Sequence, residues 1–495
     1  MSSSYTKVEF SRNQILIPLA RSSAVCSKYD PQKEAETFAT QFKDSDLFFV
    51  VAGLCAGLHV EKLLEKNSSR KIIVVENSAE DFDFLMQIPL CKKLSEDKRI
   101  IFSTPQKIFS DILQNYFPAV YGTLTFCFLR GWENAFHENF AVIKTLVEKA
   151  IQSVKADFAV QAHFGKIWQK NIFENLKIHS MQKKSSVLLK SLKSKNNRIC
   201  AVIAAGPSLD DSIQKLKETP DRYFIIATDT AYSALLKSQI LPDVVVSIDG
   251  QNISRAHFLH QNLYKNLKKD KNTFFALDLC VNSNIAKKLF EQNEELIFFS
   301  SGHPLSNLAR FFNGENFPAL QSGSGTVTIA AADLGFSLGF TQFDFLGADF
   351  CYSRGKPYAK GTYLDDIYFK AQNRLETVEK KYCALMFRTE LIKQPETDGG
   401  NLTTEVMNGY KKSFEYYLDS PKTPMSQAFN TLNLKDFKNR LKTEVQNLSE
   451  NYLEALGNPV FYALLPLMAF YEKSADARES YKLARANLLR YTENI

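Results

Sequence analysis

The feature that most constrains the fold is a regular alternation of short apolar runs with helical segments in the middle of the chain. Six such runs lie at Ile199–Ala204, Tyr223–Ala227, Val244–Ile248, Thr273–Leu277, Leu296–Phe299 and Phe343–Leu346. Runs of this length are typical of buried strands. Strands that alternate with helices indicate a largely parallel sheet covered on both faces. The sequence therefore predicts an α/β fold for this part of the chain.

A second α/β pattern precedes the first. The apolar run Asp46–Val51 leads to a glycine turn at Gly53 and then to a helical stretch and a second apolar run, Lys71–Glu76. Further strands are expected at Arg99–Phe102 and Gly122–Phe128. Glu76 ends the second strand about 20 residues after the glycine turn. In folds that bind a dinucleotide or an adenosyl group, an acidic residue at this position holds the ribose. Two functions stay open for this part, a retained cofactor site and a scaffold or interaction role.

The remaining segments are predicted to be helical. Asn139–Leu192 contains no strong strand, and Trp168, Asn171 and Asn175 share one face of it. Beyond Tyr410 the pattern is helical to the end, with interruptions at prolines. We therefore expect an N-terminal α/β domain at 1–150, a central domain at 151–420 and a C-terminal helical domain at 421–495.

Composition and charge argue against several classes of protein. The net charge of +7 is spread over many lysines, without the dense basic tract of a nucleic-acid binder. The eight cysteines form no C-x-x-C pair, which indicates a reduced compartment without a disulfide framework or zinc site. The N-terminus lacks a signal-peptide profile, and the longest apolar stretches are too short to span a bilayer. We expect a cytoplasmic protein without membrane or nucleic-acid partners.

The first candidate site is the turn Gly206-Pro207-Ser208, which follows a strand and opens a helix. Ser208 and Asp211 have the spacing of a capping box. The free N–H groups and partial positive charge of a helix start suit a phosphate. An ordinary strand-to-helix turn with a serine cap is the alternative.

Acidic residues stand at or just beyond strand ends, at Asp229, Asp249, Asp278 and Asp349. The carboxyl ends of parallel strands border the ligand crevice of an open sheet. Because carboxylates repel phosphate, these residues are expected to contact sugar or ribose hydroxyls, a base amine or an acceptor hydroxyl. Each of them taken alone could instead be a helix cap or a loop acid.

Two further loops carry polar groups that suit a nucleotide. Ser322-Gly323-Ser324 lies in a glycine-rich segment before a helix that is expected to begin near Thr326, where the backbone can approach a ligand closely. The loop after the last strand carries Tyr352, Arg354, Lys356 and Tyr358, and phenol and cationic groups can stabilise a departing phosphate. The alternatives are a flexible loop for the first segment and a surface loop with buried tyrosines for the second.

Four motifs occur in this order: AGPSLDD, ATDTAYSALL with PDVVVSIDG, SGSGTVT, and LGADFCYSRGKPYAKGTY. Together they resemble the motility-associated factor (Maf) flagellin glycosyltransferases, and also the bacterial sialyltransferases that use CMP-sialic acid. The resemblance covers roughly residues 155–415. It implies a central Rossmann-like, GT-A-like domain of the sialyltransferase type with a largely parallel sheet, an N-terminal Rossmann-like domain and a C-terminal helical domain.

The resemblance also implies a reaction. A nonulosonic acid of the pseudaminic or legionaminic type would be transferred from a CMP-activated donor to a serine or threonine of flagellin, with inversion. Tyr352 and Tyr358 would bind the leaving phosphate, and Asp229 and Asp249 would face the nucleotide or sugar. The nucleotide site would be lined by Gly206, Pro207, Ser208, Ser322, Gly323, Ser324 and Asp349. No obligate cofactor or metal is expected, and a role for Mg²⁺ stays open.

The sequence departs from the sialyltransferases in its histidines. Those enzymes use a histidine base downstream of the tyrosines, whereas the last histidine here is His303. An aspartate such as Asp249 is then the candidate base, unless the chemistry needs little help from a base.

Two other functions stay open. One is a pterin pyrophosphokinase-like enzyme whose aspartates hold Mg²⁺. The other is a flagellin-binding accessory protein with a decayed site.

Overall fold

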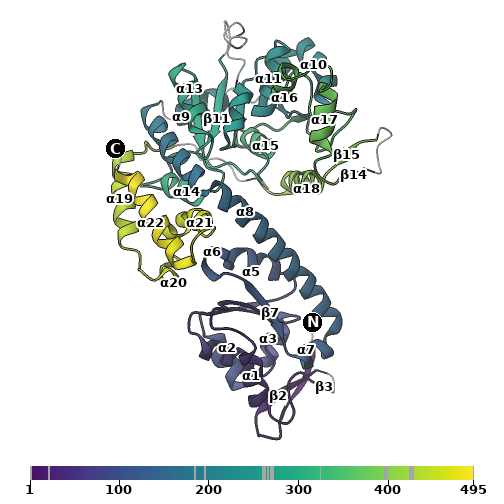
Figure 1. Ribbon diagram of the computed structural model, residues 1–495, viewed down its shortest axis with the longest axis vertical. Coiled ribbons are helices and arrows are strands. Elements are labelled where there is room, and N and C mark those ends of the chain that lie inside the picture. Colours follow the sequence, from purple (N-terminus) through teal and green to yellow (C-terminus); the bar gives the residue numbers. More distant parts are fainter. Residues whose placement is uncertain are drawn as a thin grey trace. The chain divides into compact units, whose positions relative to one another are not determined.

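The computed structural model describes residues 3–20, 23–182, 185–193, 197–258, 264, 267, 272–323, 325–394, 400–422 and 429–493. The chain forms two compact units (Figure 1). The N-terminal unit consists of Met1–Gly165 and Leu448–Asn487, and the central unit consists of Lys166–Asn447 and Leu488–Ile495. The segment expected as a C-terminal helical domain is thus divided between the two units.

The central unit contains a six-stranded parallel sheet in the order β12-β11-β10-β9-β8-β13. All six predicted apolar runs are confirmed as strands, and the mixed α/β class with parallel sheets is confirmed. The strands are β8 Ile199–Ile203, β9 Tyr223–Thr228, β10 Val244–Ser247, β11 Phe274–Asp278, β12 Glu295–Phe299 and β13 Phe343–Leu346.

The strand order of this sheet reverses at β8. The chain adds β9 to β12 on one side of β8 and then returns to place β13 on the other side. The pairing runs from Phe343 with Cys200 to Leu346 with Ile203, so that β8 and β13 end at the same level. In open α/β sheets, ligands bind outside the carboxyl ends of the strands at such a reversal. The topology therefore places the candidate crevice at the ends of β8 and β13.

Helices cover both faces of the sheet because successive side chains of a strand point to opposite faces. Ala201 and Ile203 pack with α10 (Leu209–Glu218) and α11 (Asp229–Lys237). Cys200 and Val202 pack on the other face, where α15 (Val327–Ser337) and α18 (Glu405–Asp419) lie. Figure 1 shows α10, α11 and α16 gathered together.

The other elements of the central unit are mostly short. The long helix α8, His137–Met181, enters this unit at Lys166, and α22, Ala477–Glu493, enters it at Leu488. The remaining elements are α9 Ser185–Lys193, η1 Pro220–Arg222, η2 Asn252–Phe258, α13 Ser283–Glu291, α14 Pro304–Arg310, α16 Tyr363–Lys370, α17 Val378–Met386, β14 Ile392–Lys393, β15 Leu402–Thr403 and α19 Leu434–Gln446. Of the helices in the described ranges, none combines the length and apolarity needed to cross a bilayer.

The N-terminal unit has a four-stranded parallel sheet in the order β6-β5-β4-β7. Its strands are β4 Phe48–Ala52, β5 Lys71–Val75, β6 Ile100–Ser103 and β7 Leu124–Phe128, at the four places that the sequence predicts. An antiparallel sheet of β1 Tyr5–Phe10, β2 Leu16–Ala20 and β3 Ser23–Ala24 was not predicted. The helices are α1 Pro31–Thr40, α2 Leu58–Lys66, α3 Ala79–Leu85, α4 Pro89–Ser95, α5 Ile108–Asn115, α6 Pro118–Tyr121, α7 Arg130–Ala135, α20 Tyr452–Ala455 and α21 Pro459–Tyr471.

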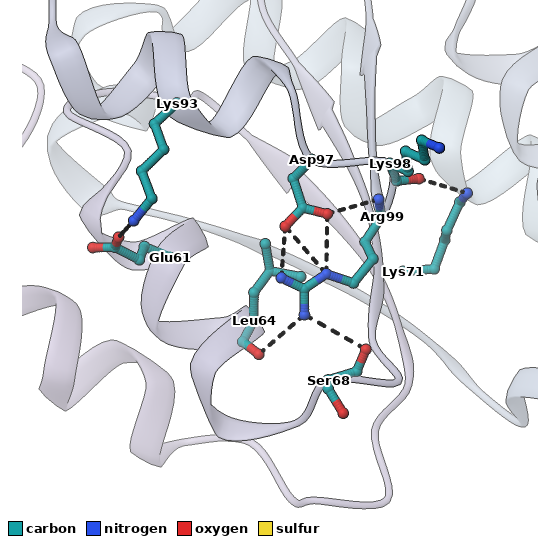
Figure 2. Close-up of polar contacts among 8 residues, drawn as sticks. All are labelled: Glu61, Leu64, Ser68, Lys71, Lys93, Asp97, Lys98 and Arg99. Carbon is teal, nitrogen blue, oxygen red and sulfur yellow. Dashed lines mark hydrogen bonds and ion pairs between the residues drawn. The ribbon is translucent and has the colours of Figure 1, made fainter.

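One polar cluster fixes the start of β6 (Figure 2). The Arg99 guanidinium donates to both carboxylate oxygens of Asp97, with its closest contact at 2.6 Å. The same group reaches the carbonyls of Leu64 at 3.4 Å and Ser68 at 3.5 Å, at the end of α2. One side chain thus ties the end of α2 to the entry of β6. Figure 2 shows the contacts converging on this guanidinium.

Glu76 is enclosed by protein groups. Its carboxylate accepts hydrogen bonds from Leu54 N at 2.6 Å, from the Tyr5 hydroxyl at 3.0 Å and from Trp132 Nε1 at 3.2 Å. Glu76 is fully buried, and a Cβ at Gly53 would collide with the Trp132 indole. The ribose position of a dinucleotide fold is therefore filled by side chains. The geometry therefore favours a scaffold or interaction role for the N-terminal unit over a retained cofactor site. An open groove of about 820 Å³ lies elsewhere, between α1 and β7, and neither Gly53 nor Glu76 lines it.

The buried Glu76 should make the free energy of unfolding depend on pH. Burial raises the pKa of its carboxyl from the ordinary 4.5 to about 7, so the folded chain keeps a proton that the unfolded chain has lost. The resulting stabilisation is complete below pH 4.5 and is lost as the pH rises through 7, at a cost of about 3 kcal/mol. Glu76→Gln should remove this part of the pH dependence.

The measurement is denaturant unfolding at pH 5 and pH 8. The chain has two tryptophans, so Trp132 fluorescence can be followed alone in a Trp168→Phe background. The parent should lose more stability than the Glu76→Gln variant between the two pH values. Equal losses in both would show that the carboxyl is not protonated in the folded unit.

Candidate functional site

Two loops predicted to bind the nucleotide meet at the ends of β8 and β13. The Asp349 carboxylate accepts a hydrogen bond from Ser208 N at 2.7 Å and another from the Ser208 hydroxyl. Gly206 N donates to Gly347 O at 2.7 Å. Residues 141 positions apart are thus joined in one junction at the strand reversal.

This junction changes the role expected for the first turn of α10. The Ser208 side chain makes no cap hydrogen bond to the helix, so the predicted capping box is wrong. The N–H groups of Ser208, Leu209, Asp210 and Asp211 all have acceptors, the first being Asp349 Oδ2. An anion, the Asp349 carboxylate, already stands at the place expected for phosphate. A phosphate at the amides of this turn would therefore have to displace Asp349.

The cationic side chains of the tyrosine loop are paired with α10. Arg354 makes two hydrogen bonds to Asp211, at 2.9 and 2.8 Å, and Lys356 lies 3.2 Å from Asp210. The main-chain N–H of Lys360 also donates to Asp210, at 2.8 Å. These charges hold the loop against the helix. The expectation that Arg354 and Lys356 face a departing phosphate is therefore not met in this structure.

The strand-end aspartates are engaged with their own loops. Asp229 is buried and accepts from Thr230 N at 2.7 Å and from the Ser247 hydroxyl at 2.6 Å. Asp249 accepts from Gln251 N at 2.9 Å and from the Ser254 hydroxyl at 2.7 Å. Asp229 thereby connects the ends of β9 and β10, and Asp249 holds the start of the segment that becomes η2.

Asp278, the last residue of β11, is also buried and engaged. It accepts from Cys280 N at 2.6 Å and from Ser301 N at 2.7 Å, and burial raises the pKa of its carboxyl. The carboxylate links the loops that follow β11 and β12, a structural role of the kind that the sequence left open.

Tyr352 and Tyr358 are held by main-chain contacts at either end of their loop. Tyr352 pairs with Leu402 through N–O distances of 2.6 and 2.9 Å, and Ala359 N donates to Ala205 O at 2.9 Å. Burial raises the pKa of both phenols, and the electrostatic effect of Tyr352 raises the pKa of Tyr358 further. Within the described ranges neither hydroxyl has a hydrogen-bond partner. Burial thus keeps both phenols in the protonated form, which can donate a hydrogen bond.

Three further residues, which no sequence motif had singled out as site residues, interact with Tyr352 or Tyr358 directly or through Tyr363. Together the five residues form the tyrosine cluster: Tyr352, Tyr358, Tyr363, Arg388 and His257. The pKa of Tyr363 is raised by burial and then by Tyr358, Tyr368, Asp229 and Asp249, and its ring centroid lies 6.5 Å from that of Tyr358. The exposed Arg388 lowers the pKa of both Tyr352 and Tyr358, against the larger effect of burial. The His257 ring lies 4.4 Å from the Tyr363 ring. Tyr363 stands in the quoted GTY motif, whereas no motif marks Arg388 or His257.

The glycine-rich loop lies against α15 and α18, next to Ile329 and Ser413. Thr326 caps α15 by accepting from Thr328 N at 3.4 Å, so the predicted helix start is confirmed. Ser322 O accepts from the N–H groups of residues 325 and 326 at 3.0 Å, and a Cβ at Gly323 would meet Ile329 and Ser413. No hydrogen bond in the described ranges joins Ser322 or Gly323 to the tyrosines. Ser324 lies outside the described residues.

The polar face of α8 clamps the loops that follow β10 and β11. Asn171 Nδ2 donates to Cys280 O at 3.0 Å and to Gly250 O at 3.4 Å. Asn175 Nδ2 donates to Leu279 O at 3.0 Å and Val281 O at 2.9 Å. All these acceptors are main-chain carbonyls, so the predicted face of Asn171 and Asn175 fixes the paths of the two loops.

The fold defined by these elements is found in a solved structure of known class. The structure of the Maf glycosyltransferase from Magnetospirillum magneticum AMB-1 matches 100% of this chain and 87% of that chain, with a TM-score of 0.58 and 14% sequence identity. The chain has the fold of a Maf glycosyltransferase, and the resemblance predicted from the motifs is confirmed at the level of the fold. Residues 170–355 match the family described as 6-hydroxymethylpterin diphosphokinase MptE-like.

Two proteins of Treponema pallidum (strain Nichols), both described as uncharacterized, are closer in sequence. One is 31% identical over 220 residues, which are 43% of this chain and 75% of that protein. The other is 35% identical over 147 residues, which are 30% of this chain and 67% of that protein. The chain belongs to the same family as these two T. pallidum proteins.

Proposed function

We propose that the chain transfers a nonulosonic acid of the pseudaminic or legionaminic type from a CMP-activated donor to a serine or threonine hydroxyl of flagellin. The observation that carries the proposal is the loop after β13, which carries the phenols Tyr352 and Tyr358 and is held beside the strand reversal of a glycosyltransferase fold. Such donors suit an oxygen that gains negative charge as a bond breaks.

In the proposed reaction, the acceptor oxygen attacks the anomeric carbon while the bond to the CMP phosphate breaks. The sugar then resembles an oxocarbenium ion, as in glycoside hydrolysis, and negative charge builds up on the phosphate. Tyr352 and Tyr358 donate to that phosphate, and the exposed guanidinium of Arg388, which lowers the pKa of both phenols, adds positive charge. Asp229 and Asp249 face the nucleotide or sugar. Gly206, Pro207, Ser208, Ser322, Gly323, Ser324 and Asp349 form the walls of the nucleotide site.

The direct test uses the purified chain with CMP-pseudaminic acid and CMP-legionaminic acid in separate reactions with purified flagellin. The expected result is CMP release and a mass increase of flagellin by one or more nonulosonic acid residues. Calorimetry should also show that CMP binds. Absence of both CMP binding and transfer would contradict the proposal and favour an accessory protein with a decayed site.

A second candidate function follows from the match to the MptE-like family over residues 170–355. It is pyrophosphoryl transfer to a pterin, in which strand-end aspartates hold Mg²⁺. Incubation with ATP, Mg²⁺ and 6-hydroxymethylpterin separates the two functions. Formation of the pterin diphosphate with strict Mg²⁺ dependence, together with no turnover of CMP-sugars, would favour this reading.

A further inference from the structure

The proposed transfer releases a proton from the acceptor hydroxyl, and the described side chains of the tyrosine cluster differ in their ability to take it. The three phenols Tyr352, Tyr358 and Tyr363 are held in the protonated form by burial and nearby charges. They act as donors and cannot accept the proton as phenolates near neutral pH. A protein base for this proton is therefore a group other than these three phenols.

The strand-end aspartates Asp229, Asp249 and Asp349 already accept hydrogen bonds from protein groups. Both oxygens of Asp229 accept from Thr230 N and the Ser247 hydroxyl, and both oxygens of Asp249 accept from Gln251 N and the Ser254 hydroxyl. Asp349 is bound in the same way by Ser208. Asp229 and Asp349 each join two segments of the fold, and Asp249 holds its own loop. A base at one of them would have to break such a contact when it turned toward a substrate.

The hydroxyls of the Leu402–Thr404 segment are committed as well. The Thr403 hydroxyl donates to Phe350 O at 3.0 Å, and the Thr404 hydroxyl accepts from Met407 N as the cap of α18. Both residues are buried. The Thr403 and Thr404 hydroxyls therefore hold nearby main-chain groups in place.

His257 differs from these side chains because one of its ring nitrogens is not engaged in a hydrogen bond with the described residues. Its side chain is 7% exposed, and its Nδ1 is a buried atom without a hydrogen-bond partner among the described residues. A buried polar atom left without a partner destabilises a fold, so such an atom calls for an explanation. The imidazole lies edge-on to Tyr363, with ring centroids 4.4 Å apart and planes at 74°. Tyr363 in turn interacts with Tyr358, Asp229 and Asp249.

The η2 segment, which carries His257, is bound by Asp249. Asp249 binds Gln251 N and the hydroxyl of Ser254, which is one turn before His257 in η2. The carboxylate therefore fixes the path of the backbone that carries the imidazole. This gives Asp249 a positioning role and leaves the imidazole as the group with an unused nitrogen.

We propose that His257 is the catalytic base that accepts the proton of the acceptor hydroxyl, an inference that rests on the proposed function. The acceptor oxygen forms its bond to the anomeric carbon as its proton passes to the His257 imidazole. The bond between the anomeric carbon and the CMP phosphate oxygen breaks, and CMP leaves with the bonding electron pair. Asp249 holds the η2 segment in place for this step.

The test compares His257→Ala, His257→Gln and the control His163→Gln, in which an exposed histidine of α8 is replaced. Each full-length variant is assayed for flagellin glycosylation with the CMP-nonulosonic acid that the parent uses, for CMP affinity by calorimetry, and for rescue by added imidazole. We expect both His257 variants to lose about 100-fold or more in kcat for transfer. Their Kd for CMP should stay within about threefold of the parent, and KM for flagellin should change less than kcat. Imidazole should restore part of the activity of His257→Ala but not of His257→Gln.

Two outcomes would overturn the assignment. One is a transfer rate of His257→Gln within about threefold of the parent. The other is a loss of transfer in both variants that is matched by an equal loss of CMP affinity and is not rescued by imidazole, because His257 would then support the fold only. A parent chain that neither binds CMP nor modifies flagellin would instead refute the proposed function itself.

Discussion

Replacement of both Tyr352 and Tyr358 by phenylalanine is expected to lower kcat for nonulosonic acid transfer by about a thousandfold or more. Removal of a single well-placed donor to a developing oxyanion costs about 10²–10³ in kcat, and the two effects need not add fully. Phenylalanine keeps the ring and its packing, so that only the hydroxyl is lost. Each single variant should show a smaller loss than the pair.

The measurement is kcat for transfer to flagellin, with the Kd for CMP determined alongside. Tyr416→Phe is the matched control, because Tyr416 lies on α18 with 77% of its surface exposed. It should leave kcat unchanged. If the double variant transfers the sugar at the rate of the parent, Tyr352 and Tyr358 do not bind the leaving phosphate and the site assignment is wrong.

Gly206→Ala is expected to destabilise the junction between the loops after β8 and β13. A Cβ at this position would lie 2.5 Å from Gly347 O and 2.7 Å from Asp349 Oδ2. The first of these atoms belongs to the backbone and cannot turn away, so the loops must separate. Overpacking of this kind costs about 1–3 kcal/mol, and the loss of the Gly206–Gly347 hydrogen bond would add to it. CMP affinity should fall as well, since both loops border the proposed nucleotide site.

The control for this variant is Gly409→Ala in α18. A Cβ there meets nothing within 4 Å, and alanine in place of glycine inside a helix stabilises by about 0.5–1 kcal/mol. Denaturant unfolding and CMP calorimetry of both variants check the prediction. A Gly206→Ala chain as stable as the parent and with the same CMP affinity would show that the two loops are not held together as described.

The two parallel sheets could be predicted from the sequence because their signal is local. A run such as Tyr223–Ala227 is apolar throughout, as a strand buried on both faces must be. β1 was missed because its residues are largely half-buried or exposed, so that no apolar run marks it. The positions of Asp229, Asp249 and Asp349 at strand ends were likewise visible, since one strand and one turn define each.

The partners of those residues could not be predicted, because they come from distant segments. The spacing of Ser208 and Asp211 predicts a mutual cap, yet Asp349 binds Ser208 and Arg354 binds Asp211. Such choices depend on which strands become neighbours in the sheet. His257 was overlooked for a related reason. It lies upstream of the tyrosines, and only the fold brings η2 next to Tyr363.

The clamp formed by α8 limits how this chain can change through evolution. Asn171 and Asn175 recognise four carbonyl groups and no side chain of the loops that they hold. Side chains at positions 279 and 281 can therefore diverge under packing constraints alone, whereas insertion or deletion of one residue would move a carbonyl out of reach of its amide. Among relatives with this fold, the length of these loops should vary less than their composition.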